Sequence, residues 1–254
     1  MIKLIAKYSF ILLLMMASGK NPDPAFFGGV KPEDYLTGRF NPAKNKLFIS
    51  VAELGIPALN DNQLLRRDTA SALKKMYNDF HSAHPRIKLL VYSAARNFNV
   101  QKSIWEEKWD GKRLVEGKRL NVSVKDPLKR ALTILKYSSM PGTSRHHWGT
   151  DFDINRLSNE YYDSGEGKII YDWLKANAGK YGFCQPYTAG RNSGYEEERW
   201  HWSYYPVSGV LLKEWNKLFK SGIIRIKQKG LFKGSAEAGN LAPQYVNAIN
   251  ESCK

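Results

Sequence analysis

The sequence predicts an α+β fold in which a small antiparallel sheet is flanked by helices. Apolar residues recur at helical spacing in some segments and form short or alternating runs in others, without a sustained strand–helix–strand rhythm. The chain has 254 residues, of which 43% are hydrophobic and 13% aromatic, so it can bury a sizeable core and is neither disordered nor fibrous. We expect one main domain with an extension at each end.

The N-terminal part of the chain is expected to precede the folded domain. Residues 1–19 contain two lysines, an uncharged apolar run and then small residues, which is typical of an export signal. The apolar run is short for a membrane span, and a retained anchor is the alternative. Residues 20–45 hold Asn-Pro, Asp-Pro, Gly-Gly and Lys-Pro pairs and are predicted to form an irregular linker. We therefore expect an exported protein of the periplasm, cell envelope or extracellular space, without a stable membrane span after cleavage.

The main domain is predicted to cover residues 46–222, and it begins with a helix and a strand. Apolar residues recur at helical spacing from Ala70 to Phe80, within a helix expected to start at Asp61. The short apolar run at residues 87–92 includes β-branched side chains and predicts a buried strand.

Later elements carry clearer boundary signals. Asp126 followed by Pro127 is a typical helix start, because the carboxylate can cap a free N–H and proline fits the first turn. Residues 149–155 alternate between apolar and polar, which predicts a strand with Asp151 and Asp153 on one face. The other expected elements are helices at 98–109, 171–181 and 210–219 and an aromatic strand at 200–205.

The formal net charge of +15 predicts an anionic partner. Residues 223–254 are expected to form a basic C-terminal extension, with a last short helix, which could contact anionic envelope polymers or simply be solvated. Nucleic acid is not an expected partner, because the export signal and the lack of a clustered basic helix argue against it.

The two cysteines exclude a disulfide-dense scaffold and a thiolate zinc cluster. In an oxidising compartment Cys184 and Cys253 could form one bridge. Two unpaired thiols are the alternative, because the sequence carries no information on the distance between them.

Three of the five histidines lie in two short motifs, Ser-Arg-His-His-Trp-Gly-Thr-Asp-Phe-Asp and Glu-Arg-Trp-His-Trp. A hydrolytic zinc ion needs three protein ligands, one open position for water and a nearby carboxylate as base. His146, Asp153 and His201 can supply the ligands, and Glu198 the base. Two neighbours could compete as ligands, since Asp151 shares the strand face of Asp153 and His147 adjoins His146.

The two motifs resemble those of the VanY-type zinc D-alanyl-D-alanine carboxypeptidases. Their mark is Ser-x-His-x6-Asp followed later by Glu-x-x-His, and the matching residues here are Ser144, His146, Asp153, Glu198 and His201. The resemblance covers roughly residues 46–206. It implies the zinc peptidase fold shared by hedgehog-type domains and D-Ala-D-Ala carboxypeptidases.

A second group of residues agrees with the same family. Arg96 and Gln101 have the spacing of an Arg and a Gln that the family carries. The resemblance implies that Arg96 holds the substrate carboxylate or the developing negative charge, and that Ser144 and Gln101 donate or accept hydrogen bonds near the substrate. One departure is Asp151, where the family often has Ala.

The activity implied by the resemblance is zinc-dependent removal of the terminal D-alanine from peptidoglycan stem peptides. In that reaction the two histidines and Asp153 bind Zn²⁺, and Glu198 takes a proton from water and passes it to the leaving amine. L,D-carboxypeptidase action, endopeptidase action on cross-links and a non-catalytic cell-wall-binding domain of the same fold stay open as alternatives.

Overall fold

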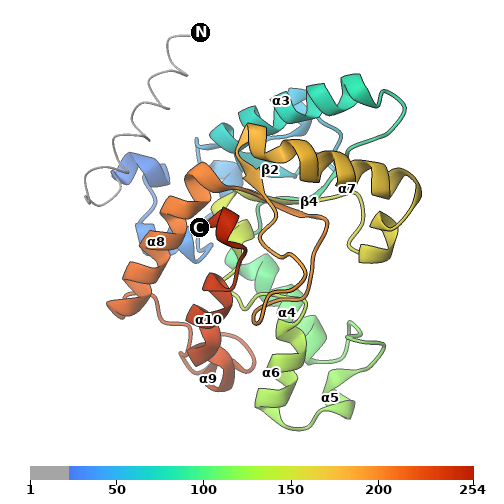
Figure 1. Cartoon of the computed structure of the whole chain (residues 1–254). Helices are drawn as coiled ribbons and strands as arrows, with labels where there is room; N and C mark the ends of the chain where they lie inside the picture. The colour runs from blue at the N-terminus through green and yellow to red at the C-terminus, as the bar shows by residue number, and fades with distance from the viewer. Residues whose placement is uncertain (1–22) are drawn as a thin grey trace.

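The computed structural model describes residues 23–254, and the predicted export signal lies outside the described residues. Two antiparallel sheets form the centre of the fold (Figure 1). The larger sheet has the strand order β3-β4-β6-β5 and the smaller one pairs β1 with β2. The strands are β1 Phe48–Ser50, β2 Leu64–Arg66, β3 Val91–Ser93, β4 Asp151–Ile154, β5 Phe183–Cys184 and β6 His201–Tyr204. The predicted α+β fold with a small antiparallel sheet is confirmed.

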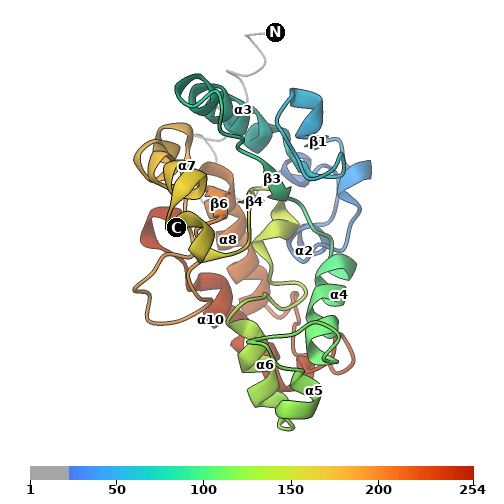
Figure 2. The ribbon, with the colours of Figure 1, turned by 90° about the vertical axis from the view of Figure 1, so that its right-hand side faces the viewer.

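Helices surround the sheets on several sides. In Figure 2, β3, β4 and β6 lie centrally, with α3 above them, α7 to their left and α5 and α6 below. The α-helices are α2 Pro32–Leu36, α3 Arg67–Ala83, α4 Phe98–Trp109, α5 Leu120–Ser123, α6 Pro127–Leu135, α7 Gly165–Asn177, α8 Tyr205–Lys220, α9 Ser235–Ala238 and α10 Ala242–Asn247. The short 3-10 helices are η1 Pro24–Phe27, η2 Pro42–Lys44, η3 Ala52–Leu54, η4 Arg145–Trp148, η5 Asn159–Tyr162, η6 Ala178–Tyr181, η7 Gly239–Leu241 and η8 Glu251–Cys253. Within residues 23–254, no helix combines the length and the apolar character that crossing a bilayer requires.

The two faces of the larger sheet have different surroundings. Phe152 and Ile154 of β4 pack in one hydrophobic cluster with side chains of α3 and α7. Asp151 and Asp153 alternate with them and are also buried, but their polar groups meet other polar groups. The alternation predicted for this strand is therefore confirmed, and it places two carboxylates on one side of the sheet.

Several element boundaries follow from capping residues visible in the sequence. Asp126 accepts a hydrogen bond from the backbone N–H of Lys129 at 2.7 Å and starts α6, as predicted. The helix expected from Asp61 instead begins at Arg67, because the preceding residues form β2 and pair with β1, Leu65 opposite Ile49. Local helical spacing cannot reveal such a pairing with a distant segment.

The predicted N-terminal linker is wrong for its described part. From Asp23 onward the chain folds into η1, α2 and η2, and Phe27 and Tyr35 are fully buried. The Tyr35 hydroxyl donates to the carbonyl of Trp148 at 2.9 Å and accepts from Arg66 at 3.0 Å. The Pro and Gly pairs form caps and turns between aromatic side chains, so this segment packs beneath η4 and supports it.

The C-terminal segment also packs into the core instead of extending from it. Ile226, Phe232 and Val246 are buried in the same hydrophobic cluster as the apolar face of α8. A disulfide joins Cys184 of β5 to Cys253, with the two Cα atoms 5.7 Å apart. The bridge that the sequence left open is therefore formed, and it fastens the end of the chain to the central sheet.

Replacing Cys253 with Ser should lower the free energy of unfolding by about 4 kcal/mol, since the bridge closes a loop with a sequence separation of 69 residues. Guanidinium denaturation of the variant and of the oxidised protein measures the difference. Wild-type protein treated with a reductant should match the variant. A loss below about 1 kcal/mol would show that the bridge adds little constraint to the unfolded chain.

Candidate metal centre

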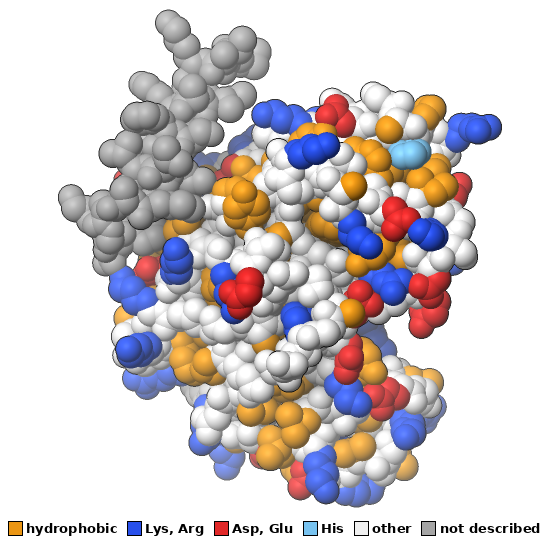
Figure 3. Space-filling view, viewed as in Figure 1, with side chains coloured by type: hydrophobic (Ala, Val, Ile, Leu, Met, Phe, Trp, Pro, Cys, Tyr) orange, Lys and Arg blue, Asp and Glu red, His pale blue; other side chains and the backbone are white. Residues whose placement is uncertain are grey.

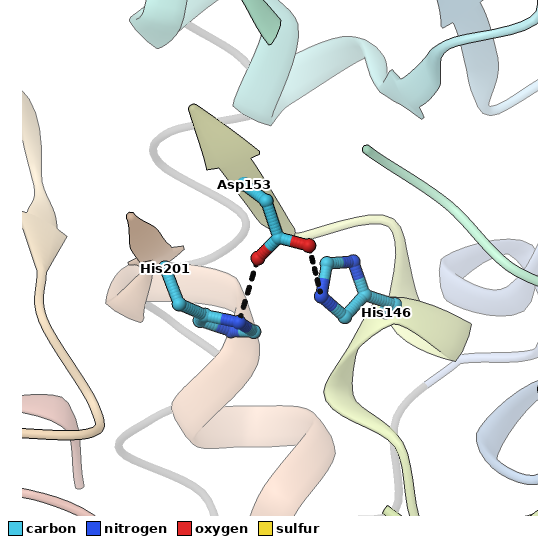
Figure 4. Close-up of side chains that lie close together, drawn as sticks. All are labelled: His146, Asp153 and His201. Carbon is cyan, nitrogen blue, oxygen red and sulfur yellow. Dashed lines mark ion pairs between the residues drawn. The ribbon is translucent and has the colours of Figure 1, made fainter. Parts of the chain in front are cut away.

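Three side chains from three separate segments converge at one point. His146 comes from η4, Asp153 from β4 and His201 from the first residue of β6, and Figure 4 shows them facing one another. Asp153 and His201 are direct partners in the β4–β6 ladder, which places their side chains side by side. One possible ligand atom of each residue lies within 4.8 Å of the others, and all three residues are buried.

Each histidine directs one ring nitrogen to the centre and binds the protein with the other. Nδ1 of His146 lies 2.8 Å from the carbonyl of Ala94, which can only accept, so Nδ1 carries the proton. Nε2 of His146 then presents its lone pair 3.4 Å from Asp153 Oδ2 and has no hydrogen-bond partner among the residues that the structure describes. His201 turns its Nδ1 to Asp153 Oδ1 at 3.1 Å and to Glu198 Oε2 at 3.3 Å. These donor atoms fit a metal ion.

The electrostatics of the cluster keep Asp153 charged and His146 neutral, which are the forms that bind a cation. Burial opposes the charge of Asp153, but His146 and His201 outweigh it and hold the pKa of Asp153 below its usual range. Burial and the charge of Arg96 lower the pKa of His146. Burial also opposes a charge on His201, but the hydrogen bonds of Asp151, Asp153 and Glu198 raise its pKa well above the usual value. A metal ion would take the place of that proton.

Asp151 supports His201 from the side opposite the candidate metal. Its Oδ1 lies 3.0 Å from Nε2 of His201 and accepts from Nε of Arg145 at 2.8 Å. Its Oδ2 accepts from the Thr150 hydroxyl at 2.6 Å. Both carboxylate oxygens are thus engaged away from the centre, so the geometry makes Asp151 an orienting partner of His201 and not a fourth ligand.

Replacing Asp151 with Asn should weaken metal binding by about 10- to 100-fold, because the partner that orients His201 and increases its basicity is lost. Competition with a metallochromic chelator measures the affinity. Asp172→Asn, on the exposed surface of α7, is the matched control and should bind the metal like the wild type. Equal affinities for the two variants would contradict the orienting role.

His147 also has both ring nitrogens engaged by the protein. Nδ1 lies 2.7 Å from the carbonyl of Arg96, and Nε2 accepts the backbone N–H of Gly142 at 3.1 Å. Burial is the main cause that lowers its pKa to about 3, so the ring is neutral near pH 7. His147 is therefore not positioned as a ligand, and it braces the backbone of Arg96. Gly38 leaves room for this ring, since a Cβ there would lie 2.4 Å from Nδ1.

In a regular strand Glu198 and His201 would point to opposite faces, because they are three residues apart. A turn explains how both side chains nevertheless reach the centre. The backbone N–H of His201 bonds to the carbonyl of Glu198 at 3.3 Å, so Glu198 lies in a turn just before β6. The turn is held by the Glu198 N–H, which donates to the carbonyl of Tyr187 at 2.9 Å. The Glu198 side chain thereby lies beside the candidate metal position.

The other predicted site residues are Arg96, Ser144 and Gln101, and each is at least partly buried. Arg96 is half-buried, and its backbone N–H donates to the carbonyl of His146 at 3.2 Å. Within residues 23–254 its Nε has no hydrogen-bond partner. Burial lowers the pKa of Arg96, and the charges of Asp153 and Glu198 oppose that shift. Gln101 donates to the carbonyl of Ser139 at 2.8 Å. In the described part of the chain, the buried Ser144 hydroxyl and Oε1 of Gln101 have no hydrogen-bond partner.

Sequence reasoning missed three residues near the centre. Arg145 holds Asp151, and its place inside the histidine motif was a signal that could have been used. The ring of Tyr187 lies 4.8 Å from that of His201, and Lys108 interacts electrostatically with Glu198. Tyr187 and Lys108 lie outside the motifs, in segments whose approach to the site depends on the tertiary fold.

Comparison with known proteins agrees with this picture. A buried cluster of two histidines and a carboxylate, with a further carboxylate beside it, on an α+β scaffold is the arrangement of a candidate metallopeptidase. The profile of the family described as "VanY: D-alanyl-D-alanine carboxypeptidase" matches residues 62–207, which is more than half of the chain. The chain therefore belongs to the VanY family, whose peptidases are hydrolases. No curated protein sequence matches it significantly.

Solved structures with a similar fold include three peptidases. The LdcB LD-carboxypeptidase is 21% identical with a TM-score of 0.50, and the alignment covers 73% of this chain and 83% of that one. VanYB in complex with D-alanine-D-alanine is 20% identical with a TM-score of 0.45, covering 66% and 83%. A mutant of the D,D-pentapeptidase VanY in complex with Zn(II) is 22% identical with a TM-score of 0.45, covering 66% and 84%. At these identities the first likeness supports the fold alone.

Proposed function

We propose that this protein is a zinc-dependent carboxypeptidase that removes the terminal D-alanine from peptidoglycan stem peptides. The observation that carries the proposal is the meeting of His146, Asp153 and His201 within 4.8 Å, with Glu198 on the same side of His201 as Asp153. Membership of the VanY family supports the choice of the D-alanyl-D-alanine bond.

Each residue of the centre has a separate part in the proposed reaction. His146 through Nε2, His201 through Nδ1 and Asp153 hold the ion. A bound zinc ion would make water more acidic and would polarise the substrate carbonyl. Glu198 accepts a proton from the attacking water and passes it to the nitrogen of the leaving alanine. Its carboxylate suits this role because Oε2 lies 3.3 Å from Nδ1 of His201, the nitrogen that would bind the ion.

Arg96 supplies the specificity for a free chain end. Its guanidinium is half-buried at the centre, and within the described residues it has no ion-pair partner at short distance. A forked cation of this kind suits the two oxygens of a terminal carboxylate. The unpartnered Ser144 hydroxyl and Oε1 of Gln101 are available for hydrogen bonds with the peptide.

The proposed location is outside the cytoplasm, in the cell envelope or beyond it. The apolar run within residues 1–19 and the bridge between Cys184 and Cys253 support export, since such bridges persist in oxidising compartments. Lys and Arg side chains are scattered over the face seen in Figure 3 and do not gather in one patch. This distribution suits a general attraction to anionic envelope polymers.

Incubation with purified stem peptides tests the proposed activity directly. Pentapeptide ending in D-Ala-D-Ala should lose the mass of one alanine when zinc is present, and the loss should stop after chelation. Tetrapeptide in a parallel reaction tests the L,D-bond, and cross-linked dimer tests endopeptidase action. Absence of cleavage in all three reactions, with zinc bound, would leave only a non-catalytic wall-binding role.

A further inference from the structure

A second cation, Lys108, lies on the helix that carries Gln101. Lys108 is two helical turns beyond Gln101 on α4, so the two side chains share one face of the helix. Gln101 donates to the carbonyl of Ser139, and Lys108 Nζ lies 2.5 Å from the hydroxyl of Ser138. Both side chains therefore reach the segment that leads directly to Ser144.

Lys108 is half-buried, yet its side-chain partner within the described residues, the Ser138 hydroxyl, is neutral. Within residues 23–254 no carboxylate lies within ion-pair distance of it, whereas the nearby Arg113 is paired with Glu107 at 2.9 Å. Burial and the charge of Arg113 lower the pKa of Lys108 to about 8, Glu198 opposes the shift and Arg96 adds to it. The segment that Lys108 reaches is itself joined to the residues just before Glu198, because the backbone N–H of Glu196 donates to the carbonyl of Lys136 at 2.8 Å.

An ammonium group that is half-buried among other cations lacks the compensation that proteins normally provide. An anionic group of the substrate would supply it. Arg96 already suits the terminal carboxylate, so Lys108 is free for a second one. The ammonium group is a point charge that accepts a carboxylate from several directions, which fits a group on a flexible side chain.

We propose that Lys108 binds a second carboxylate of the substrate, in addition to the terminal carboxylate at Arg96. The preferred stem peptide then carries an acidic side-chain group near the cleaved bond, as a diaminopimelate residue does and a lysine residue does not. This inference rests on the proposed function, and it narrows the substrate class.

Three synthetic stem peptides test this inference. They carry diaminopimelate, diaminopimelate with its side-chain carboxylate converted to the amide, or lysine at the same position. The wild type should hydrolyse the acid with a kcat/KM about tenfold above that of the amide, which is the size expected for one charge-assisted hydrogen bond. In Lys108→Gln the ratio between acid and amide should fall close to one.

Lys102→Gln is the matched control, because Lys102 lies on the same helix and is paired with Glu106 at 3.8 Å. It should keep the wild-type ratio between acid and amide. Equal ratios in the Lys108→Gln and Lys102→Gln variants would overturn the inference, as would a wild type that does not distinguish acid from amide.

A binding measurement separates this inference from the proposed reaction. In zinc-loaded Glu198→Gln protein, calorimetry should give about tenfold tighter binding of the acid peptide than of the amide. If no peptide is hydrolysed by the wild type but this preference holds, the proposed reaction fails and the second carboxylate site stands. Equal affinities for acid and amide overturn the site, whatever the outcome of the hydrolysis experiment.

Discussion

Glu198→Gln should lower kcat by about a thousandfold and leave the metal in place, because the amide cannot accept the proton of the attacking water. The substitution keeps the shape of the side chain, and the three ligand residues stay unchanged. Stem-peptide hydrolysis gives the rate, and elemental analysis of the same sample gives the metal content. The combination of lost turnover and full metal content identifies a base that is not a ligand.

Glu196→Gln is the matched control, since Glu196 is an exposed neighbour in the same acidic run. It should keep the wild-type rate. If Glu198→Gln turned over at the wild-type rate, the proton would have to move by another route. If it lost the metal, Glu198 would be a ligand, and the reaction scheme would need a different base.

His201→Ala should lose the metal during dialysis. Its affinity for the metal should fall by more than about a hundredfold, which is the largest effect expected when a residue that only orients a ligand is removed. Removal of this imidazole leaves His146 and Asp153 as the only two members of the cluster. A structural or catalytic site of this type needs three protein ligands to hold the ion firmly. Metal content by elemental analysis and the far-ultraviolet dichroism of the same sample are the two measurements.

His81→Ala serves as the control for the loss of a histidine, because His81 lies exposed near the end of α3. This variant should keep the metal. Full metal content in His201→Ala would exclude His201 as a ligand. A loss of dichroism would instead show that the empty space beside Asp151 and Asp153 destabilises the fold.

The three residues of the centre could be predicted from the sequence, because the residues that identify them are close together along the chain. His146, Asp153 and His201 occur in two short motifs, and strand alternation already placed Asp153 beside Asp151. The helix start at Asp126 was equally predictable, since a cap depends on residues three positions apart. Where the signal lies in neighbouring residues, sequence and structure agree.

The features that the sequence did not reveal depend on distant segments. Phe27 and Tyr35 lie among Pro and Gly pairs that predict a linker, and only the tertiary fold shows the cavity that they fill. The role of Asp151 was open until the structure showed Arg145 and His201 on its Oδ1 and Thr150 on its Oδ2. The bridge to Cys253 likewise required a distance between residues far apart in the chain.

The disulfide between Cys184 and Cys253 has a consequence for truncated forms of the protein. Cys184 lies opposite Ser203 in the sheet, and the hydroxyl of Ser203 accepts from Arg145, the residue that holds Asp151. A polypeptide truncated before residue 253 would contain every residue of the metal centre but could not form this disulfide. The segment that contains Cys253 must therefore be synthesised, and the two cysteines oxidised, before the strands around the histidines are covalently constrained.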